Sequence, residues 1–181
     1  MSNPAPLLVT RRLSIRTWQM DDLPSIIDFC SDPEVMKYVG DGHPWSDAEC
    51  HDFLEQEIRH QQQHGFCRWA VVEQRAGPVI GFCGFVSTGH AVEMGWRLAA
   101  NAWGRGLASE AAAAILRYGT GTLRLSPILA TVQPDNRASL RLAEKIGFRE
   151  TGRDARDGRQ LVVFETASEP PKSSCTIAVE I

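Results

Sequence analysis

The sequence predicts a mixed α/β fold, in which a central sheet of about seven strands is flanked by helices. Two observations lead to this prediction. Segments with a two-residue apolar period are interspersed with segments of helical spacing along the whole chain. In the second half, two passages run from a strand through a helix to a further strand, which argues for a mixed sheet with helices on its faces.

The first quarter of the chain should form one strand and two helical segments. Residues 8–18 alternate between apolar and polar side chains, which is typical of a strand. Asp21 and Asp22 are candidate N-caps of a helix that is broken at 31–33. Residues 34–39 should add one short helical turn before a loop that contains two glycines and a proline.

A longer helix should begin at a capping box. The Ser46 hydroxyl can accept from the backbone three residues on, while the Glu49 carboxylate reaches back to the start of the helix. Cys50, Phe53 and other apolar residues then recur at helical spacing, and the helix should end before Gly65.

The middle of the chain changes from helical to strand periodicity. Residues 69–72 and 79–86 flank turn residues at 75–78, which predicts a hairpin. Residues 92–98 alternate strictly and form a third strand, with the apolar set on one face. An alanine-rich helix is expected at 106–118, where small side chains allow it to lie close to a sheet.

The last third should complete the sheet. Strands are expected at 128–132, 148–152 and 161–165. Asp135 or Asn136 should cap a helix that ends at Gly147. Residues 1–167 are expected to form a single domain and residues 168–181 a mobile tail.

Composition favours one globular domain. The chain has 181 residues, 43% of them hydrophobic and 23% charged, with a net charge of -3. No basic run stands out, so nucleic acid is not an expected partner. Five cysteines occur singly, which predicts reduced thiols in a cytoplasmic protein. Apolar stretches fall short of the roughly 18 residues of a membrane span, and we expect no signal peptide.

The most informative stretch runs from Leu98 to Ala108, where a strand ends and a helix begins. Gly104 and Gly106 permit unusual backbone angles, and N–H groups at a helix start favour a phosphate. Ser109 at the sixth position does not fit a dinucleotide-binding pattern, and the Gly-Lys-Ser/Thr of a P-loop is absent. On these residues alone, a phosphate site and a plain tight turn are equally good interpretations.

Three passages, in their order and spacing, resemble the GNAT superfamily of acetyl-CoA-dependent N-acetyltransferases, in particular its ribosomal-protein N-terminal acetyltransferase branch. The passages are residues 10–16 with 31–36, residues 93–98 leading into 103–111, and residues 136–148. The resemblance implies a GNAT-like fold with a mostly antiparallel sheet. It also implies direct acetyl transfer from acetyl-CoA to an amine, with no covalent enzyme intermediate and no metal.

The resemblance also implies where acetyl-CoA binds. The family's pyrophosphate loop falls on residues 101–106, although its first position is usually Arg or Gln. Backbone N–H groups from 104 to 108 would hold the pyrophosphate, and the strand end would pair with the pantetheine arm. The implied contacts are Leu98, Asn101, Gly104, Arg105, Gly106, Leu107, Ala108 and Asn136.

Two side chains are candidates for the chemistry that this reaction needs. An alkyl amine with a pKa of about 10 is mostly protonated at neutral pH, so a base must take its proton. Glu93 could do so through a water, but pairing with Arg97 or Arg68 across the sheet is an equally good interpretation. The resemblance places Ser139 where a hydroxyl can donate to the leaving thiolate, and a local bond in the first helical turn is the alternative. A backbone N–H at 95–98 could stabilise the oxyanion.

The acceptor side is less defined. Asp41 and Trp45 could receive a cationic amine, although a Trp that packs onto the surface is the alternative. A protein or peptide N-terminal amine is the expected acceptor because the branch resemblance points there. A small-molecule amine (an amino acid, polyamine or aminoglycoside) and a non-catalytic acyl-CoA-binding module are the alternatives. The protein should be a monomer or a homodimer.

A metal site is not expected. His60 and His64 have the spacing of a zinc-binding helix, but Gln61 stands where a metalloprotease needs a glutamate. A solvated polar helix end explains these residues better.

Overall fold

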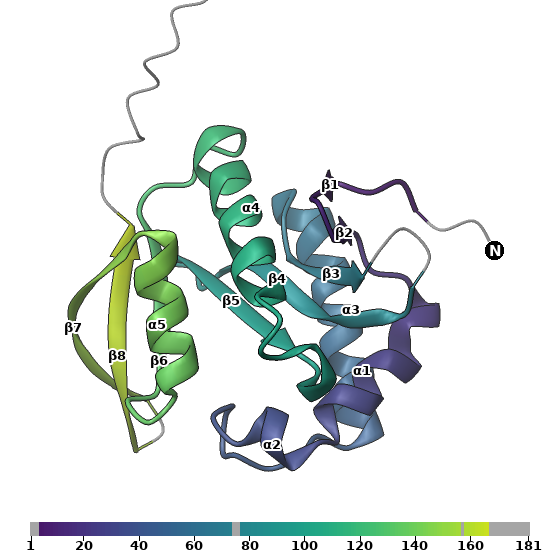
Figure 1. Ribbon diagram of the computed structural model, residues 1–181, viewed down its shortest axis with the longest axis horizontal. Coiled ribbons are helices and arrows are strands. Elements are labelled where there is room, and N and C mark those ends of the chain that lie inside the picture. The colour runs from purple at the N-terminus through teal and green to yellow at the C-terminus, as the bar shows by residue number, and fades with distance from the viewer. Residues whose placement is uncertain (1–3, 74–76, 157, 167–181) are drawn as a thin grey trace, which may run out of the picture.

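An eight-stranded sheet runs through the molecule in the order β1-β2-β3-β4-β5-β6-β8-β7 (Figure 1). The computed structural model describes residues 4–73, 77–156 and 158–166. The strands are β1 (Leu8–Val9), β2 (Leu13–Arg16), β3 (Arg68–Glu73), β4 (Val79–Ser87), β5 (Val92–Leu98), β6 (Ile128–Val132), β7 (Phe148–Arg156) and β8 (Arg159–Thr166). Neighbouring strands are antiparallel except β5 and β6, which are parallel. The predicted mixed, mostly antiparallel sheet is confirmed.

The sheet has eight strands rather than about seven because the strand predicted at 8–18 is a hairpin of β1 and β2. The chain turns after β1, where the Thr10 N–H donates to the Leu13 carbonyl at 2.9 Å. Asp22 stands at the N-cap position before the first helix, but its carboxylate does not cap that helix. It forms a buried ion pair with Arg16 instead, at 2.7 Å.

Helices cover both faces of the sheet. They are α1 (Leu23–Cys30), α2 (Pro33–Met36), α3 (Asp47–His64), α4 (Leu107–Gly121) and α5 (Arg137–Ile146), with short 3-10 turns at Met20–Asp22 and Ala100–Ala102. Phe82 of β4 packs against rings from α1 and α3, whereas Phe85 packs so closely on Gly119 of α4 that a Cβ there would overlap its ring. Side chains three apart on a strand point to opposite faces. Helices α1 and α3 therefore lie on one face and α4 on the other.

The helix ends follow the predicted signals. Ser46 and Glu49 form the expected capping box of α3, with the Glu49 carboxylate 2.8 Å from the Ser46 backbone nitrogen. Asn136 caps α5 with its side-chain oxygen. Gly65 and Gly147 end α3 and α5 in the left-handed conformation that glycine adopts without strain.

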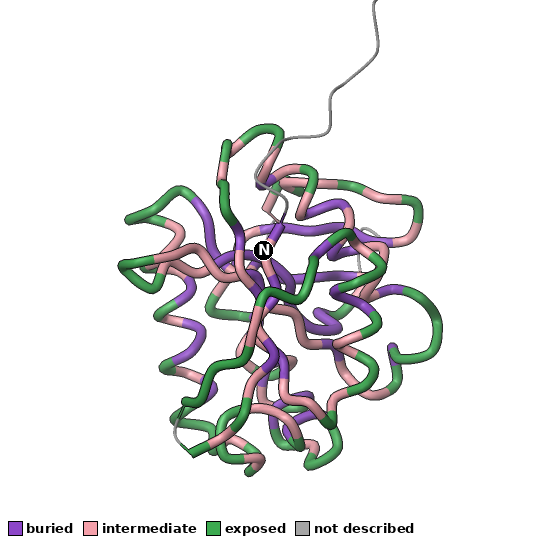
Figure 2. The backbone as a smooth tube through the Cα atoms, turned by 90° about the vertical axis from the view of Figure 1, so that its left-hand side faces the viewer, coloured by how far each residue is buried: buried purple, intermediate pink, exposed green. Residues whose placement is uncertain are grey.

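The hydrophobic core lies on both faces of the inner strands. The exposed residues, green in Figure 2, are concentrated in loops and outer segments. Trp69, Phe85 and Phe164 are among its largest fully buried side chains. The single cysteines of the described core are buried, and burial raises the pKa of Cys67 and Cys83 well above the ordinary thiol value. Such thiols are packing residues rather than nucleophiles.

Strands β5 and β6 are paired only at one end. Their ladder joins Val92 to Ile128 and Glu93 to Leu129, and β5 then runs on to Leu98 without β6 beside it. This divergence opens the sheet between β5 and β6 and leaves one edge of β5 unpaired by any described strand. The functional site lies at this opening.

Some expectations fall outside the described residues, including residues 75 and 76 of the turn at 75–78, residue 157 in the last hairpin and the tail at 168–181. The β7–β8 hairpin is longer than the predicted segments at 148–152 and 161–165. Within the described ranges, no helix is long and apolar enough to cross a membrane.

Candidate functional site

The turn between β5 and α4 presents backbone N–H groups at a helix start. Gly104 and Gly106 have φ values of +70° and +74°, in the region that favours glycine. Gly106 is the N-cap of α4 and no side chain caps this helix. The Glu110 N–H donates to the Gly106 carbonyl and is the first to form a hydrogen bond of the helix. The N–H groups of residues 107–109 come before it and have no partner within the helix. The unusual glycine backbone angles that the sequence predicts here are present, and the turn has the form of an anion site.

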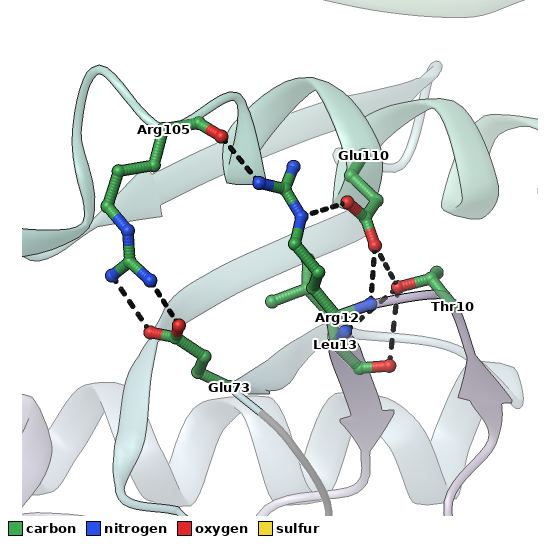
Figure 3. A network of polar contacts seen from close by, with 6 residues as sticks. All are labelled: Thr10, Arg12, Leu13, Glu73, Arg105 and Glu110. Carbon is green, nitrogen blue, oxygen red and sulfur yellow. Dashed lines mark hydrogen bonds and ion pairs between the residues drawn. The ribbon is translucent and has the colours of Figure 1, made fainter.

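A network of hydrogen bonds and ion pairs joins this turn to the β1–β2 hairpin (Figure 3). The Glu110 carboxylate accepts from Thr10 Oγ1 at 2.6 Å, from the Arg12 backbone at 2.8 Å and from Arg12 Nε at 2.7 Å. Arg12 also donates to the Arg105 carbonyl at 2.8 Å. Burial would raise the pKa of Glu110, but these hydrogen bonds outweigh it and hold the pKa at about 2. The hairpin of β1 and β2 is thereby joined to the turn.

A cavity of about 420 Å³ lies beside the turn, and we call it the loop cavity. Of the residues predicted to contact acetyl-CoA, those that line it are Leu98, Gly104, Gly106, Leu107, Ala108 and Asn136. Asn101 is exposed and does not line it. The Arg105 side chain points away and forms an ion pair with Glu73, so only its backbone belongs to the turn.

The open edge of β5 carries backbone groups toward the same space. The Ala99 N–H donates to Ile80 of β4 at 2.8 Å. Backbone groups alternate in direction along a strand, so Trp96 and Leu98 direct theirs away from β4, toward the opening. The Leu98 carbonyl accepts from the Trp103 indole at 2.8 Å. The backbone N–H groups at this edge are where the sequence predicts an oxyanion contact.

A second cavity of about 760 Å³ adjoins the first, and we call it the Glu93 groove. It is lined by residues from β3, β4, β5, β6, α5, the loop after α2, the loop before α5 and the β7–β8 hairpin. The residues that line both cavities are Tyr38, Val39, Trp96, Asn136 and Ser139. The two cavities therefore meet at the opening between β5 and β6.

Ser139 lies at this junction with its hydroxyl oriented by a neighbour. The Trp96 indole N–H lies 3.2 Å from Ser139 Oγ. An indole nitrogen can only donate, so the serine oxygen accepts and its own hydrogen must point elsewhere. No described residue accepts from that hydroxyl, and the Ser139 backbone N–H is already bonded to Asn136 at 3.1 Å. Ser139 can therefore donate a hydrogen bond into the cavities.

Glu93 lines the groove but is not a free carboxylate. Arg156 of β7 binds both of its oxygens, at 2.8 Å and 3.3 Å, and Thr131 lies 3.5 Å away. The expected alternative partners Arg97 and Arg68 do not pair with Glu93, because Arg68 pairs with Glu57 of α3 instead. The bonds to Glu93 raise the pKa of Arg156. Any base function of Glu93 has to operate beside this cation.

The two residues predicted for the acceptor are separated. Asp41 lines the groove and is exposed, and a hydrogen bond from the His43 backbone lowers the pKa of its carboxyl. Trp45 lines neither cavity. Its ring packs on Phe53 at 5.4 Å and under the guanidinium of Arg97 at 4.5 Å, as the packing alternative proposed.

Several residues of the site were not found by sequence reasoning. The sequence pattern predicts only an apolar strand position for Trp96, and it indicates no role for Trp103 beyond the motif and none for Arg156 or Arg159. No local signal marks them, since Arg156 reaches Glu93 across 63 positions of the chain.

His60 accepts from the Ser87 backbone, and no group of three or more metal-ligating side chains was found in the described ranges.

Comparison with known proteins places this geometry in a family. The sequence pattern of the acetyltransferase (GNAT) domain matches residues 12–149. The chain belongs to the GNAT acetyltransferase family. This GNAT chain is 34% identical over 150 residues to "Uncharacterized N-acetyltransferase p20" of Bacillus licheniformis, covering 80% of the chain and 83% of the relative.

A further relative and a solved structure agree with this assignment. "Uncharacterized N-acetyltransferase YnaD" of Bacillus subtilis is 33% identical over 147 residues, with 80% and 84% covered. An acetyltransferase structure from Agrobacterium tumefaciens is 28% identical with a TM-score of 0.79, and the match covers 92% of this GNAT chain and 97% of that one. The predicted GNAT fold and acetyltransferase activity are confirmed. The ribosomal-protein branch stays a prediction.

Proposed function

We propose that this GNAT acetyltransferase transfers an acetyl group from acetyl-CoA directly to a primary amine, and that the amine is a protein or peptide N-terminus. One observation carries the proposal. The loop cavity, with its anion-binding turn, and the Glu93 groove meet at Ser139 and Trp96, beside an unpaired strand edge. Two substrates entering from the two cavities would meet at that point.

The residues of the loop cavity fit acetyl-CoA. An uncapped helix start with two left-handed glycines suits a pyrophosphate. The open edge of β5 suits an amide-containing arm, which can pair with a strand through its own N–H and C=O groups. A self-immunity acetyltransferase with the same fold, at 14% identity and a TM-score of 0.74, was solved in complex with acetyl-CoA and AMP. When bound, acetyl-CoA supplies the thioester.

The chain's own groups account for the proton movements. Glu93 takes one proton from the ammonium form of the amine through a water and passes it to solvent. The neutral nitrogen then forms a bond to the acetyl carbon while the carbon–sulfur bond breaks, and the second proton, lost as the amide forms, follows the same path to Glu93. A backbone N–H of β5 at Trp96 or Leu98 stabilises the oxyanion. Ser139 donates a hydrogen bond to the departing thiolate, whose final proton comes from solvent. Glu93 then returns its proton to solvent.

The choice of acceptor rests on resemblance rather than on geometry. A ribosomal-protein alanine acetyltransferase from Vibrio fischeri shares the fold at 14% identity, and a spermidine N-acetyltransferase chimera shares it at 21%. At these identities the likeness concerns the fold alone. The branch resemblance of the sequence favours the peptide N-terminus, and the groove of about 760 Å³ has room for the end of a chain. We place the reaction in the cytoplasm, where single buried thiols stay reduced.

Calorimetry on the purified chain tests the first half of the proposal. We expect micromolar binding of acetyl-CoA and none of free phosphate or NAD at the same concentrations. Thiol release in the presence of an acceptor panel tests the second half, with peptides bearing free N-termini, the same peptides blocked at the N-terminus, and small amines. Acetyl-CoA binding without transfer to any acceptor would instead support a non-catalytic acyl-CoA-binding module.

A further inference from the structure

The Glu93 groove presents both signs of charge to an acceptor. Two carboxylates line it, Asp41 and Glu93, together with three guanidinium groups, Arg68, Arg156 and Arg159. Both carboxylates are already near a cation. Glu93 binds Arg156, and Arg159 adds to the hydrogen bond from the His43 backbone in lowering the pKa of Asp41. A polycation entering this groove would therefore find both of its carboxylates already paired with an arginine or close to one.

Arg68 is held rigidly on the floor of the groove. Its Nε donates to the carboxylate of Glu57 at 2.8 Å and its backbone N–H donates to the same carboxylate at 2.7 Å. Glu57 is only 2% exposed, so from the groove the guanidinium is the accessible member of the pair. Phe53 and Phe82 lie against the guanidinium, at 5.1 Å and 5.6 Å.

The position of Arg68 is close to the reacting edge of β5. A Cβ at Gly95 would lie 3.5 Å from Arg68 Cδ, so the arginine stem crosses the strand at this glycine. Gly95 is next to Trp96, which lies at the junction of the two cavities. Arg68 Nη1 donates to no described residue, although the other nitrogens contact Glu57. A planar guanidinium with donors to spare is well suited to a carboxylate.

A second guanidinium, that of Arg97, lies over the same Phe82 ring as Arg68, at 5.0 Å, and lines the loop cavity rather than the groove. Arg97 lies on the same strand face and donates to the sulfur of Cys30 at 3.2 Å, and it forms no ion pair with a described residue. Its charge repels that of Arg68. Arg68 is therefore paired with Glu57, whereas Arg97 has no carboxylate partner among the described residues, and Arg156 balances Glu93 farther along.

We propose that the acceptor of this enzyme carries a carboxylate a few atoms from its amine, and that Arg68 binds this carboxylate while the amine lies toward Glu93. This inference rests on the proposed function and narrows its substrate class. The same chemistry is found in a free amino acid and in a peptide whose first residues include an acidic side chain. Spermidine and aminoglycosides, which carry only positive charge, do not fit it.

Matched acceptors test the inference with the wild-type enzyme. One arm compares a free amino acid with its carboxamide, and the other compares peptides that begin Ser-Glu and Ser-Gln, so that only one charge changes within each pair. We expect kcat/KM to be at least about 10-fold higher for the acidic member of the preferred pair, which also identifies the source of the carboxylate. Spermidine should be slower than either acid.

Variants assign the preference to Arg68. Removing Arg68 alone would leave Glu57 buried without its partner, so the double variant Glu57→Gln with Arg68→Gln is used. It should reduce the ratio of kcat/KM between the acidic and amide acceptors to about 1. The control Arg59→Gln removes an exposed cation of α3, the helix that carries Glu57, and should keep the ratio. Because the ratio is internal to each protein, a partly unfolded preparation does not change it.

The remaining outcomes overturn the inference in different ways. Equal rates for acid and amide, or a faster reaction with spermidine, would contradict the substrate class while leaving the proposed acetyl transfer intact. A ratio that survives the double variant would remove Arg68 as the contact. If acetyl-CoA binds but no acceptor of either charge reacts, the proposed function itself fails and this inference fails with it.

Discussion

The loop cavity and the Glu93 groove are built in different ways. The loop cavity takes its character from backbone groups in one continuous stretch, residues 98–109, where glycine conformation and a helix start create an anion site. The groove takes its character from side chains that come from strands, loops and hairpins far apart in the sequence. The residues that build the first site lie together in one passage of the sequence, whereas the second site exists only once the chain has folded.

The largest expected effect comes from changing the backbone of the loop cavity. Gly104→Val puts a branched side chain at φ +70°, which costs about 1–2 kcal/mol and distorts the turn. We expect calorimetry to show acetyl-CoA affinity reduced at least about 100-fold. Gly65→Val is the matched control, since Gly65 has φ +76° and open space around it but lies at the far end of α3. Normal affinity in Gly104→Val would refute the loop assignment.

Substitutions at the Glu93 groove should reduce turnover more than they reduce the binding of acetyl-CoA. The double variant Ser139→Ala with Glu93→Gln removes both the thiolate donor and the base, and general acid–base groups contribute about 10²- to 10⁴-fold. We expect kcat to fall by about that factor while the affinity for acetyl-CoA stays close to wild type. Time courses of thiol release measure kcat, and calorimetry measures the affinity for acetyl-CoA. Unchanged turnover would remove both catalytic assignments.

The contrast between the two cavities also explains what could be predicted from the sequence. Gly104, Gly106 and the capping box at Ser46 act through neighbours in the chain, so their structural roles were predicted correctly. The partner of Glu93 was not, because Arg156 reaches it from the β7–β8 hairpin and several arginines were equally plausible. The hairpin of β1 and β2 was missed because its turn, residues 10–12, contains none of the glycine, proline, asparagine or aspartate residues that mark a turn.

Trp96→Phe tests whether the indole orients the Ser139 hydroxyl. Without its donor, the serine hydrogen is free to turn away from the thiolate, and we expect kcat to fall about 10-fold with little change in the KM of the acceptor. The effect should vanish when Ser139 is already alanine, which a double-mutant cycle measures. Trp103→Phe is the control, because its indole donates to the Leu98 carbonyl and not to Ser139. Equal losses in both backgrounds would mean that Trp96 acts only by packing.

Glu110→Gln tests the network behind the loop. The pKa of Glu110 is lowered from 4.5 to about 2 in the folded protein, so its stabilising contribution is complete above 4.5 and is lost as the pH falls toward 2. The variant should be about 1–3 kcal/mol less stable at neutral pH and should lose less stability than wild type on acidification. Urea unfolding at several pH values measures both. Glu55→Gln, which alters an exposed pair, is the control and should keep the wild-type pH dependence.

The smallest effect is expected where a side chain of the loop points away from the cavity. Arg105→Gln breaks an exposed ion pair with Glu73, which contributes little because solvent screens it, and leaves the backbone carbonyl that accepts from Arg12. We therefore expect acetyl-CoA affinity within about 2-fold of wild type, measured by calorimetry in the same series as Gly104→Val. If the arginine mattered as much as the glycine, the loop would bind through side chains, and the distinction between a backbone-built cavity and a side-chain-built groove would no longer hold.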